Sequence, residues 1–247
     1  MNQSFYTGAV GARQQMQNMN VHANNMANVN TYGYKAQISR FASLFQQRTD
    51  SITGGTASYG VGARMLMTST NHAQGAPLQT GRAQDYFIDG NGYFALVDLQ
   101  TRQVTFTRNG AFTVAQYERP TDEVDEKGLP IMETVMALTD GEGRFVLGKD
   151  GDIIVVTDPS AEQKIGIFDF GNYDGMEHIN GTEFMPVDKN GSLYYAKGVL
   201  RRGMLEGSNV DLADSMTRMI EAQRAYSMAL KVVQTSDEIQ TTINNLR

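Results

Sequence analysis

Two short patterns contain residues of the kinds that enzymes and metal sites use. Asp169-Phe170-Gly171 spells the triplet with which protein kinases hold magnesium, but the sequence has no His-Arg-Asp loop and no glycine-rich loop after a first strand. Asp188, Asn190 and Ser192 alternate as at the start of a calcium-binding loop, yet the sixth position of that loop is not Gly and the twelfth is not Glu. We therefore interpret the first pattern as a turn at the edge of a sheet and the second as a solvated turn.

Histidine and cysteine give no further chemistry. His22, His72 and His178 are far apart along the chain and lack the spacing of zinc ligands or of a catalytic triad. The chain has no Cys, which excludes disulfide bonds and thiolate metal sites. We nominate no catalytic, metal-binding or cofactor-binding residue, and we expect a protein that is not an enzyme and uses no cofactor.

The formal net charge of −6 is unevenly distributed. No Asp or Glu occurs before Asp50, whereas that segment contains Arg13, Lys35, Arg40 and Arg48. A few scattered cations without interleaved aromatic residues do not make a nucleic-acid surface, so we expect no nucleic-acid partner. An acid-free segment rich in Asn and Gln instead favours packing against like subunits.

The hydropathy of the chain predicts no insertion into a membrane. No apolar run approaches the roughly 20 residues that a membrane-spanning helix needs. The first residues also lack the basic and apolar regions of a cleaved signal peptide. If the chain leaves the cytoplasm, we expect it to use another export route.

The stretch from Val210 to Leu246 contains no Gly and no Pro, and its apolar residues recur at alternating steps of four and three. This spacing predicts one amphipathic helix of roughly 55 Å, with Ser208 and Asp211 as a capping box at its start. A helix of this length with so regular a seam needs a partner helix. Its two apolar rows are Leu212, Met216, Met219, Gln223, Tyr226, Leu230 and Val233, and Ala222, Ala225, Ala229, Val232, Ser236, Ile239, Ile243 and Leu246.

Residues 1–30 repeat this spacing and predict the partner helix. Gly8 and Gly11 each weaken such a helix by about 1 kcal/mol relative to Ala. An ordinary core helix is one interpretation, and we favour a helix that is marginal alone and folds on meeting its partners. The apolar positions of the seam are Phe5, Ala9, Ala12, Met16, Met19, Ala23 and Met26.

Between the helices the pattern changes twice. A short helix is predicted by Phe41, Leu44 and Phe45. The stretch from Asp50 to Gly62 is rich in Gly, Ser and Thr and predicts a loop or hinge. The stretch from Val61 to Met67 alternates like one half-buried strand. From Asp85 to about Tyr195 the apolar period is two, which predicts an all-β domain of many short strands. Its turn signals are Asp89-Gly90-Asn91-Gly92, Asn109-Gly110, Asp140-Gly141, Asp150-Gly151, Asp174-Gly175 and Asn190-Gly191.

Motifs at both ends and in the middle of the chain resemble those of bacterial flagellar rod and hook proteins. Residues 24–35, Asn-Asn-Met-Ala-Asn-Val-Asn-Thr-Tyr-Gly-Tyr-Lys, match the signature N-N-x-A-N-x-N-T-x-G-[FY]-K, although Tyr32 stands where relatives often carry Pro. Residues 205–211 match L-E-x-S-N-V-[DN], and residues 219–226 match M-I-x-x-Q-R-A-[YF]. Residues 89–94 and 107–112 are similar to the family's β-core motif, whereas Gln116–Met136 is an elaboration that carries much of the acidic charge.

The resemblance and the patterns together imply an α+β fold. Long N- and C-terminal helices pair as an antiparallel coiled coil, with an all-β domain inserted between them. We expect a helical assembly domain at residues 1–35 and 205–247, a hinge, loop and extended segment at 36–84, and a β-rich outer domain at 85–204.

The resemblance further implies a structural subunit of the flagellar basal-body rod, of the FlgF or FlgG type. Such subunits polymerise into a helical tube that passes motor torque toward the hook and leaves a central export channel. The implied partners are further copies of the chain, other rod and hook subunits and the flagellar export apparatus. The implied place is the extracytoplasmic basal body, in the periplasm and cell-wall zone. Two alternatives stay open: a hook-type axial subunit, and a non-flagellar β-domain binding module with coiled-coil oligomerisation.

In such a protein the functional residues are contact residues. We expect subunit contacts from the helix seams, at Phe5, Ala12, Met16, Met19, Met26, Leu212, Met216, Met219, Tyr226 and Leu230. We expect the turns that leave and re-enter the helical domain to depend on Asn25, Asn28, Asn30, Gly33, Tyr34, Glu206, Ser208 and Asn209.

Overall fold

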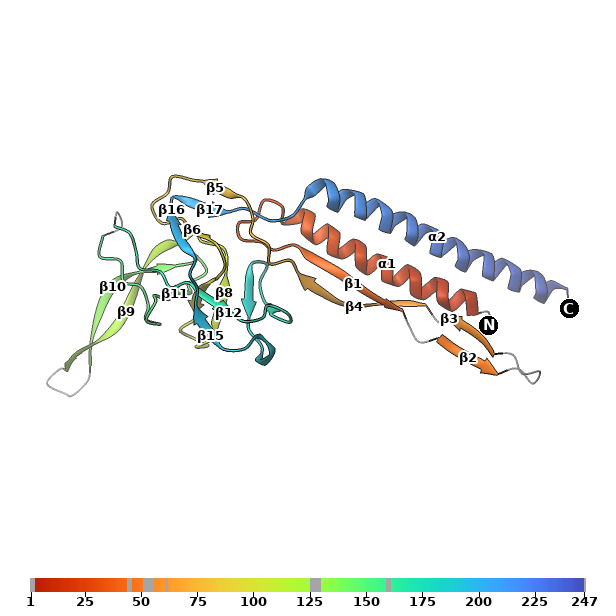
Figure 1. The fold of residues 1–247 in the computed structure, drawn as a ribbon, viewed down its shortest axis with the longest axis horizontal. Helices are drawn as coiled ribbons and strands as arrows, with labels where there is room; N and C mark the ends of the chain where they lie inside the picture. The colour runs from red at the N-terminus through yellow and green to blue at the C-terminus, as the bar shows by residue number, and fades with distance from the viewer. Residues whose placement is uncertain are drawn as a thin grey trace. The chain divides into compact units, whose positions relative to one another are not determined.

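The computed structural model describes residues 3–43, 46–50, 56–60, 62–124, 130–158 and 161–246. The chain divides into two compact units (Figure 1). The helical unit comprises Met1–Val29, Ala36–Asn71 and Val210–Arg247, and the β unit comprises Asn30–Lys35 and His72–Asn209. This division differs from the expected one at residues 36–71, which group with the helices, and at residues 30–35 and 205–209, which group with the strands.

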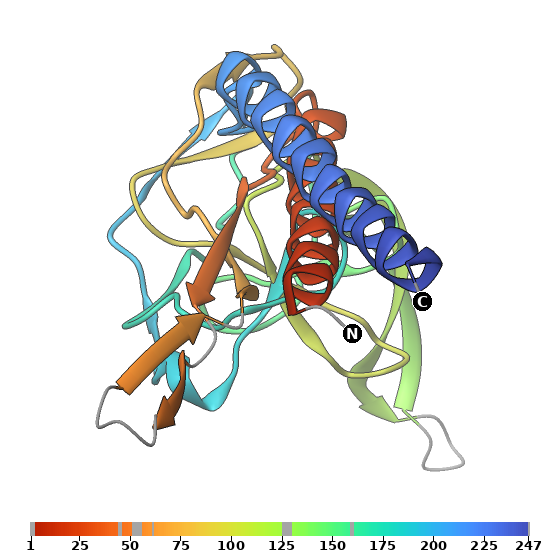
Figure 2. The same ribbon diagram turned by 90° about the vertical axis from the view of Figure 1, so that its right-hand side faces the viewer.

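The helical unit is built on two long helices, α1 (Gln3–Ala27) and α2 (Leu212–Asn245), which lie side by side in both views (Figure 1, Figure 2). They are antiparallel: the hydroxyl of Ser236 lies 3.4 Å from that of Ser4, whereas the charges of Asp214 and Arg218 act on His22 near the other end of α1. The prediction of an α+β fold with paired terminal helices is thus confirmed. Within the described residues, no helix is both long and apolar enough to cross a membrane.

Small residues make the contact between the two helices. Ala12 of α1 and Ser215, Ala222 and Ser236 of α2 are buried. A Cβ added at Gly8 would lie 3.1 Å from Cγ2 of Val233, so the backbones approach too closely there for a larger residue. The row of α2 that faces α1 is therefore the one that contains Ala222, Ala229 and Ser236.

The cap of α2 differs from the one expected. The side chain of Asp211 is the N-cap and accepts hydrogen bonds from the backbone N–H groups of Ala213 (2.9 Å) and Asp214 (3.1 Å). Ser208 lies three residues before this cap, so the predicted capping box is wrong. One carboxylate oxygen at the N-cap accepts from both N–H groups, as Asp commonly does at this position.

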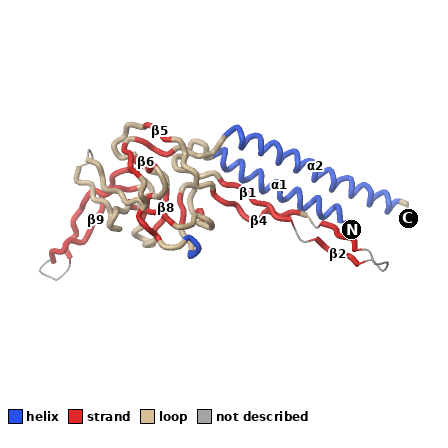
Figure 3. The backbone as a smooth tube through the Cα atoms, in the orientation of Figure 1, coloured by secondary structure: helices blue, strands red, loops and turns tan. Residues whose placement is uncertain are grey.

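The described residues between positions 37 and 70 of the helical unit form four strands that pair as two antiparallel ribbons. β1 (Gln37–Ser43) pairs antiparallel with β4 (Ala63–Thr70), and β2 (Gln46–Asp50) pairs with β3 (Thr56–Gly60). Figure 3 shows the β1–β4 ribbon running beside α1. The predicted short helix is wrong at Phe41, which lies in β1, while Leu44 and Phe45 lie outside the described residues. The predicted loop also contains a strand, β3.

Contacts with α1 explain why the sequence pattern between residues 37 and 70 did not predict all of these strands. The side chain of Asn25 donates to the carbonyl of Gln37 (2.8 Å) and accepts from its N–H (2.9 Å). The hydroxyl of Ser39 donates to Oδ1 of Asn18 (2.6 Å), and the N–H of Met65 donates to Oε1 of Gln14 (2.5 Å). Amide side chains of the acid-free helix therefore hold the ribbon, an interaction that the sequence of the ribbon alone does not encode.

Within its described residues, the β unit contains one seven-stranded antiparallel sheet and three two-stranded ones. The large sheet has the order β13 (Glu177–His178), β14 (Glu183–Met185), β8 (Val104–Thr107), β7 (Phe94–Val97), β11 (Phe145–Val146), β10 (Pro130–Thr139) and β9 (Thr113–Val124). The small sheets pair β12 (Phe168–Phe170) with β15 (Leu193–Tyr195), β6 (Tyr86–Asp89) with β16 (Val199–Arg202), and β5 (Pro77–Gln79) with β17 (Met204–Glu206). A short 3₁₀ helix, η1 (Asp188–Asn190), precedes β15.

Two of the predicted turn signals connect strands that do not pair with each other, whereas Asp140-Gly141 joins the paired strands β10 and β11. The turn at Asp89–Gly92 leads from β6 to β7, but β6 pairs with β16 and β7 pairs with β8 and β11. The Asn109-Gly110 turn leads from β8 to β9, which lie in the same seven-stranded sheet without pairing with each other, and the carbonyl of Gly110 accepts from the N–H of Tyr86 in β6 at 3.0 Å. A Cβ at Gly110 would lie 1.8 Å from the carbonyl oxygen of Tyr86, which explains the need for glycine. The elaboration around Gln116–Met136 is the antiparallel pair β9 and β10.

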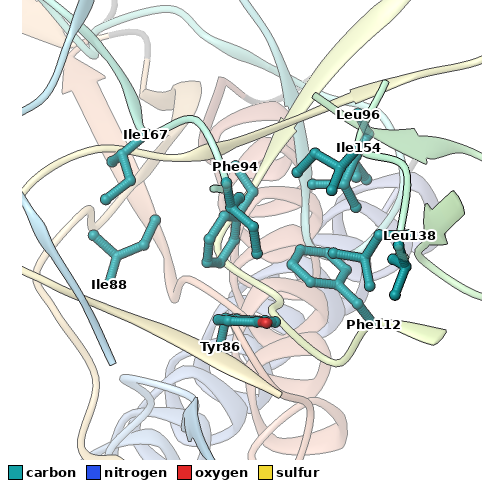
Figure 4. Close-up of a cluster of buried hydrophobic side chains, with 11 residues drawn as sticks. Tyr86, Ile88, Phe94, Leu96, Phe112, Leu138, Ile154 and Ile167 are labelled. Carbon is teal, nitrogen blue, oxygen red and sulfur yellow. The ribbon is translucent and has the colours of Figure 1, made fainter. Parts of the chain in front are cut away.

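Both faces of β7 are covered by apolar side chains. Phe94 and Leu96 point into one core, drawn in Figure 4, where the rings of Phe94 and Phe112 meet edge to face with centroids 5.1 Å apart. Tyr93 and Ala95 belong to a second, largely aromatic core. Their alternation along the strand is the period of two that the sequence shows. The second core comprises Tyr93, Ala95, Phe106, Phe168, Phe170, Met176 and Phe184.

Candidate functional site

The signature residues from three distant parts of the chain meet at Glu206 in the β unit. Its carbonyl oxygen accepts a hydrogen bond from the N–H of Gly33 (2.8 Å). Its carboxylate pairs with Nζ of Lys35 through Oε1 (2.5 Å) and with Nη1 of Arg108 through Oε2 (3.1 Å). We call Lys35, Arg108 and Glu206 the ion cluster.

Further hydrogen bonds fasten the chain segments around the ion cluster. Oε1 of Glu206 also accepts from the N–H of Gly75 (2.8 Å). The carbonyl of Ala73 accepts from Nζ of Lys35 (2.7 Å) and from the side-chain amide of Asn209 (2.9 Å). Arg108 donates to the carbonyl of Gly90 (2.8 Å). The cluster thereby joins residues 33–35, 73–75, 90, 108 and 206–209.

The ion cluster is removed from water. The side chains of Lys35 and Glu206 are each 1% exposed and that of Arg108 is 4% exposed. Burial lowers the pKa of Lys35 below its ordinary value, although the nearby carboxylate of Glu206 acts in the opposite direction. The guanidinium of Arg108 also lies 5.3 Å from the centre of the Tyr93 ring, and burial raises the pKa of that tyrosine. A small molecule cannot reach these atoms, so the cluster positions the chain and offers no binding site.

Most of the expected turn residues belong to the β unit, as the ion cluster does. Gly33 has a φ of 71°, and a Cβ there would lie 2.4 Å from the backbone nitrogen of Asn109, so only glycine fits. Tyr34 is buried, Asn30 is exposed, and Ser208 and Asn209 are half-buried. In the helical unit Asn25 holds β1, as described above, and the side chain of Asn28 donates to the carbonyl of Asn24 (2.9 Å).

Two of the three histidines lie in one aromatic cluster of the β unit, which their spacing did not predict. The Nδ1 atom of His72 lies 2.6 Å from the hydroxyl of Tyr93, and its ring stacks on that of Tyr173 at 4.9 Å. Burial, assisted by the positive charge of Lys35, lowers the pKa of His72 to about 4. Burial likewise lowers the pKa of His178, whose ring lies 4.5 Å from that of Phe184. Both rings are therefore neutral at pH 7.

The two metal-like patterns have structural uses. Asp169 accepts from the hydroxyls of Tyr173 (2.5 Å) and Tyr194 (3.2 Å) and from the N–H of Phe170 (2.8 Å). The side chain of Asn190 donates to the carbonyl of Asn172 (2.8 Å) and accepts from the N–H of Val187 (2.6 Å). Asp169 therefore lies in strand β12 and ties it to the following segment and to β15, and Asn190 closes the segment around η1 from a buried position, so neither residue lies in a solvated turn.

A third acidic group, which the sequence did not single out, surrounds Arg144. The side-chain oxygens of Asp140, Glu142 and Glu183 lie within 4.8 Å of one another. Arg144 pairs with all three, at 2.7 Å to Asp140 and to Glu142 and at a short distance to Glu183. Burial raises the pKa of Glu183, and the charge of Arg144 opposes that shift. The guanidinium thus occupies the centre of the group.

The expected contact residues on the helices differ in exposure. Ala12 is buried against α2, while Phe5, Met19, Met26, Met219 and Tyr226 are half-buried. Four others are exposed: Met16 (46%), Leu212 (41%), Met216 (45%) and Leu230 (38%). Because small residues fill the α1–α2 contact, these large apolar side chains cover the flanks and outer faces of the pair.

Comparison with known proteins agrees with this distribution of motifs. Residues 5–35 match the family model described as flagella basal body rod protein, and residues 201–246 match that of the flagellar basal body rod FlgEFG protein C-terminal region. The chain is 32% identical to the flagellar basal-body rod protein FlgG of Bacillus subtilis (strain 168), over the full length of both chains. It is 29% identical to FlgG of Borreliella burgdorferi, over all of this chain and 99% of that one. It is 23% identical to the flagellar hook-basal body complex protein FlhP of Bacillus subtilis, over the full length of both.

Proposed function

The chain belongs to the flagellar basal-body rod proteins and is a structural subunit of the flagellar basal body, and we propose that its copies polymerise into a helical tube. The tube would pass motor torque toward the hook and leave a central channel for export. It would act without making or breaking a covalent bond and without a cofactor. Its partners would be further copies, other rod and hook subunits and the flagellar export apparatus, in the extracytoplasmic part of the basal body.

The observation that carries this proposal is the apolar surface of the helix pair. Exposed large apolar side chains recur along α2, Tyr6 and Met16 add to them on α1, and soluble monomers rarely keep large apolar patches in water. On α2 the inward positions hold Ala and Ser, so the patch is not a misplaced core. The exposed residues include Met16, Leu212, Met216, Ile220, Met228, Leu230, Val232, Ile239 and Ile243.

The β1–β4 ribbon adds a second apolar surface to the helical unit. Ile38 and Phe41 of β1 are 49% and 43% exposed, and Leu66 and Met67 of β4 are 53% and 55% exposed. A two-stranded ribbon is marginal in water unless another surface covers it. A neighbouring copy would cover both ribbon and helices, and a contact between different surfaces, repeated without closing, yields a filament.

Two substitutions on α2 test the proposal. Met216→Asp and Leu230→Asp each place a charge on an exposed position, so the folded monomer should keep its stability within about 0.5 kcal/mol. In a polymer the same charge would be buried without a partner, which costs several kcal/mol and should abolish assembly. We would measure polymer by sedimentation of the purified chain, and function by swimming of cells in which each variant replaces the host protein.

Gln234→Asp, at an exposed polar position of the same helix, is the matched control and should assemble and support swimming. Normal polymers and swimming in both test variants would reject the helix contacts. A discrete, closed oligomer of the unmodified chain would instead favour a coiled-coil binding module over a rod subunit.

A further inference from the structure

Strand β15 exposes three consecutive bulky side chains, with Leu193 and Tyr195 on one face and Tyr194, whose hydroxyl is bonded to Asp169 and Phe170, on the other. Leu193, Tyr194 and Tyr195 are 46%, 49% and 54% exposed. β15 pairs with β12 on one side, and no described strand pairs with its other edge. Exposed, hydrophobic strand edges of this kind are normally blunted or covered in native proteins. We call these three residues the tyrosine edge.

A second apolar feature lies elsewhere on the β unit. It is an open pocket of about 510 Å³ over strands β7, β8 and β9 and the segment after β11. Two of its residues, Leu99 and Val104, are themselves exposed at 44% and 37%. We call it the sheet pocket, and its lining comprises Gly151, Asp152, Arg119 (which pairs with Glu133) and the apolar residues Val97, Leu99, Val104, Tyr117, Leu147, Ile153 and Val155.

Each feature has a charge beside it that lacks a partner in the subunit. Lys197, two residues after the tyrosine edge, is exposed and makes no ion pair or side-chain hydrogen bond within the described residues. Asp152, which lines the sheet pocket, is exposed and is likewise without an ion pair or side-chain hydrogen bond there. The two unpaired charges are of opposite sign.

We propose that the tyrosine edge of one copy of this chain docks into the sheet pocket of the next copy, with Lys197 of the first opposite Asp152 of the second. The apolar side chains of the tyrosine edge would pack against the apolar lining of the sheet pocket, and the charges of Lys197 and Asp152 would neutralise each other. Because the two surfaces are different and every copy carries both, the contact is heterologous and adds copies without limit. The inference rests on the proposed function and gives the β units a contact of their own, separate from that of the helices.

Charge reversal with rescue tests the pairing. Lys197→Glu and Asp152→Lys should each place like charges opposite each other and raise the critical concentration for assembly about three- to tenfold. The double variant Lys197→Glu/Asp152→Lys restores opposite charges and should return the critical concentration to within about twofold of the unmodified chain. Glu162→Lys, at another exposed acid of the β unit, is the matched control: combined with Lys197→Glu it should give no rescue.

Truncation of the edge tests the apolar part. Tyr195→Ala removes an exposed ring, so monomer stability should be unchanged while the critical concentration rises about tenfold or more, as for an aromatic side chain central to an interface. The absence of native cysteine allows a direct check. Oxidation of Lys197→Cys/Asp152→Cys should give a ladder of dimers, trimers and longer chains, and Lys197→Cys/Glu162→Cys should give none.

The outcomes separate this inference from the proposed function. If the unmodified chain polymerises and Leu230→Asp abolishes the polymer, but charge reversal changes nothing and no ladder forms, the tyrosine edge does not meet the sheet pocket. If each single reversal weakens assembly and the double variant shows no rescue, the two residues do not face each other and the pairing is likewise rejected. If the unmodified chain does not polymerise, the proposed function fails first.

Discussion

The two units of this chain differ in how far they bury their apolar side chains. Apart from the tyrosine edge, the β unit buries most of its aromatic residues: Phe94, Phe112 and Phe184 are each 0% exposed. The buried apolar residues of the described helical unit are only Ala12, Val21 and Ala222, whereas many of its large apolar side chains face water. The β unit thus has enclosed cores of its own, and the helical unit leaves many of its large apolar side chains in water.

The difference extends to polar groups. The β unit buries charges that are paired and hydrogen-bonded, as in the ion cluster. The described ion pair of the helical unit, between Asp214 and Arg218 at 2.8 Å, joins two side chains that are more than half exposed. Buried pairs are costly to break and exposed ones contribute little, so substitutions of similar chemistry should have very different effects in the two units.

The largest expected effect is that of Glu206→Gln. Removing the carboxylate leaves Lys35 and Arg108 buried without a counter-charge, which should lower the unfolding free energy of the β unit by about 3–5 kcal/mol. Hydrogen exchange read by mass spectrometry on peptides from β6, β7 and β8 would locate the loss. The matched control Glu221→Gln, on an exposed position of α2, should change stability by less than about 0.5 kcal/mol. Equal effects of the two variants would remove the contrast between the units.

A smaller effect is expected from Gly8→Leu in α1. A Cβ at this position already lies 3.1 Å from Val233 and 3.3 Å from the carbonyl of Ala229, so a larger side chain must separate the helices. We expect a loss of about 1–3 kcal/mol that is confined to the helical unit, measured by the same exchange experiment. Gly11→Ala is its counterpart, because a Cβ there meets Ala229 at an ordinary 3.9 Å and should stabilise α1 by up to about 1 kcal/mol. Exchange that accelerates equally in the β unit would argue against two separately stabilised units.

The smallest expected effect is a dependence on pH that belongs to the β unit. The pKa of His72 is about 4 in the folded chain, below its ordinary 6.5, and the pKa of His178 is lowered in the same direction. Below pH 6.5 the unfolded chain therefore binds more protons at these histidines than the folded chain does. The unfolding free energy is at its full value above pH 6.5 and decreases as the pH falls toward 4. Allowing for the partial exposure of His72, the loss should be about 1–2 kcal/mol.

Thermal unfolding followed from pH 7 to pH 4 would measure this loss. Lys35, Arg108 and Asp174 also act on His72, so a substitution must isolate the histidine. His72→Gln keeps a hydrogen-bonding group at Tyr93 and should flatten the profile of the β unit, whereas His22→Gln, at a histidine whose pKa burial also lowers, should change the profile of the helical unit only. An unchanged profile in His72→Gln would assign the pH dependence to other groups.

The sequence was most informative where one period runs for many residues. The steps of four and three predicted both helices, and the continuous run of Phe94 to Val97 predicted a strand that is now seen to be buried on both faces. Strands of two to four residues, such as β13 and β14, are too short for an alternating pattern to mark them. The ribbon at residues 37–70 was partly missed because α1 supplies its hydrogen bonds.

The ion cluster shows the same limit at the level of the site. Lys35 and Glu206 both fall in signature motifs, and Arg108 lies in the motif of the β core, so each was visible as part of a pattern. Their meeting was not, because 171 residues separate Lys35 from Glu206 and 98 separate Arg108 from Glu206. Motif matching marks which residues matter without saying what they touch.

The ion cluster also bears on how this subunit withstands force. The chain crosses between its two units after residues 29, 35, 71 and 209. On the β side, three of those crossings lie next to residues that are bonded to one another. These residues are Lys35, Ala73, Gly75, Glu206 and Asn209. A force on any one of these three connections is therefore distributed to the other two through these hydrogen bonds and this ion pair. The strands that the connections lead into then bear the force together.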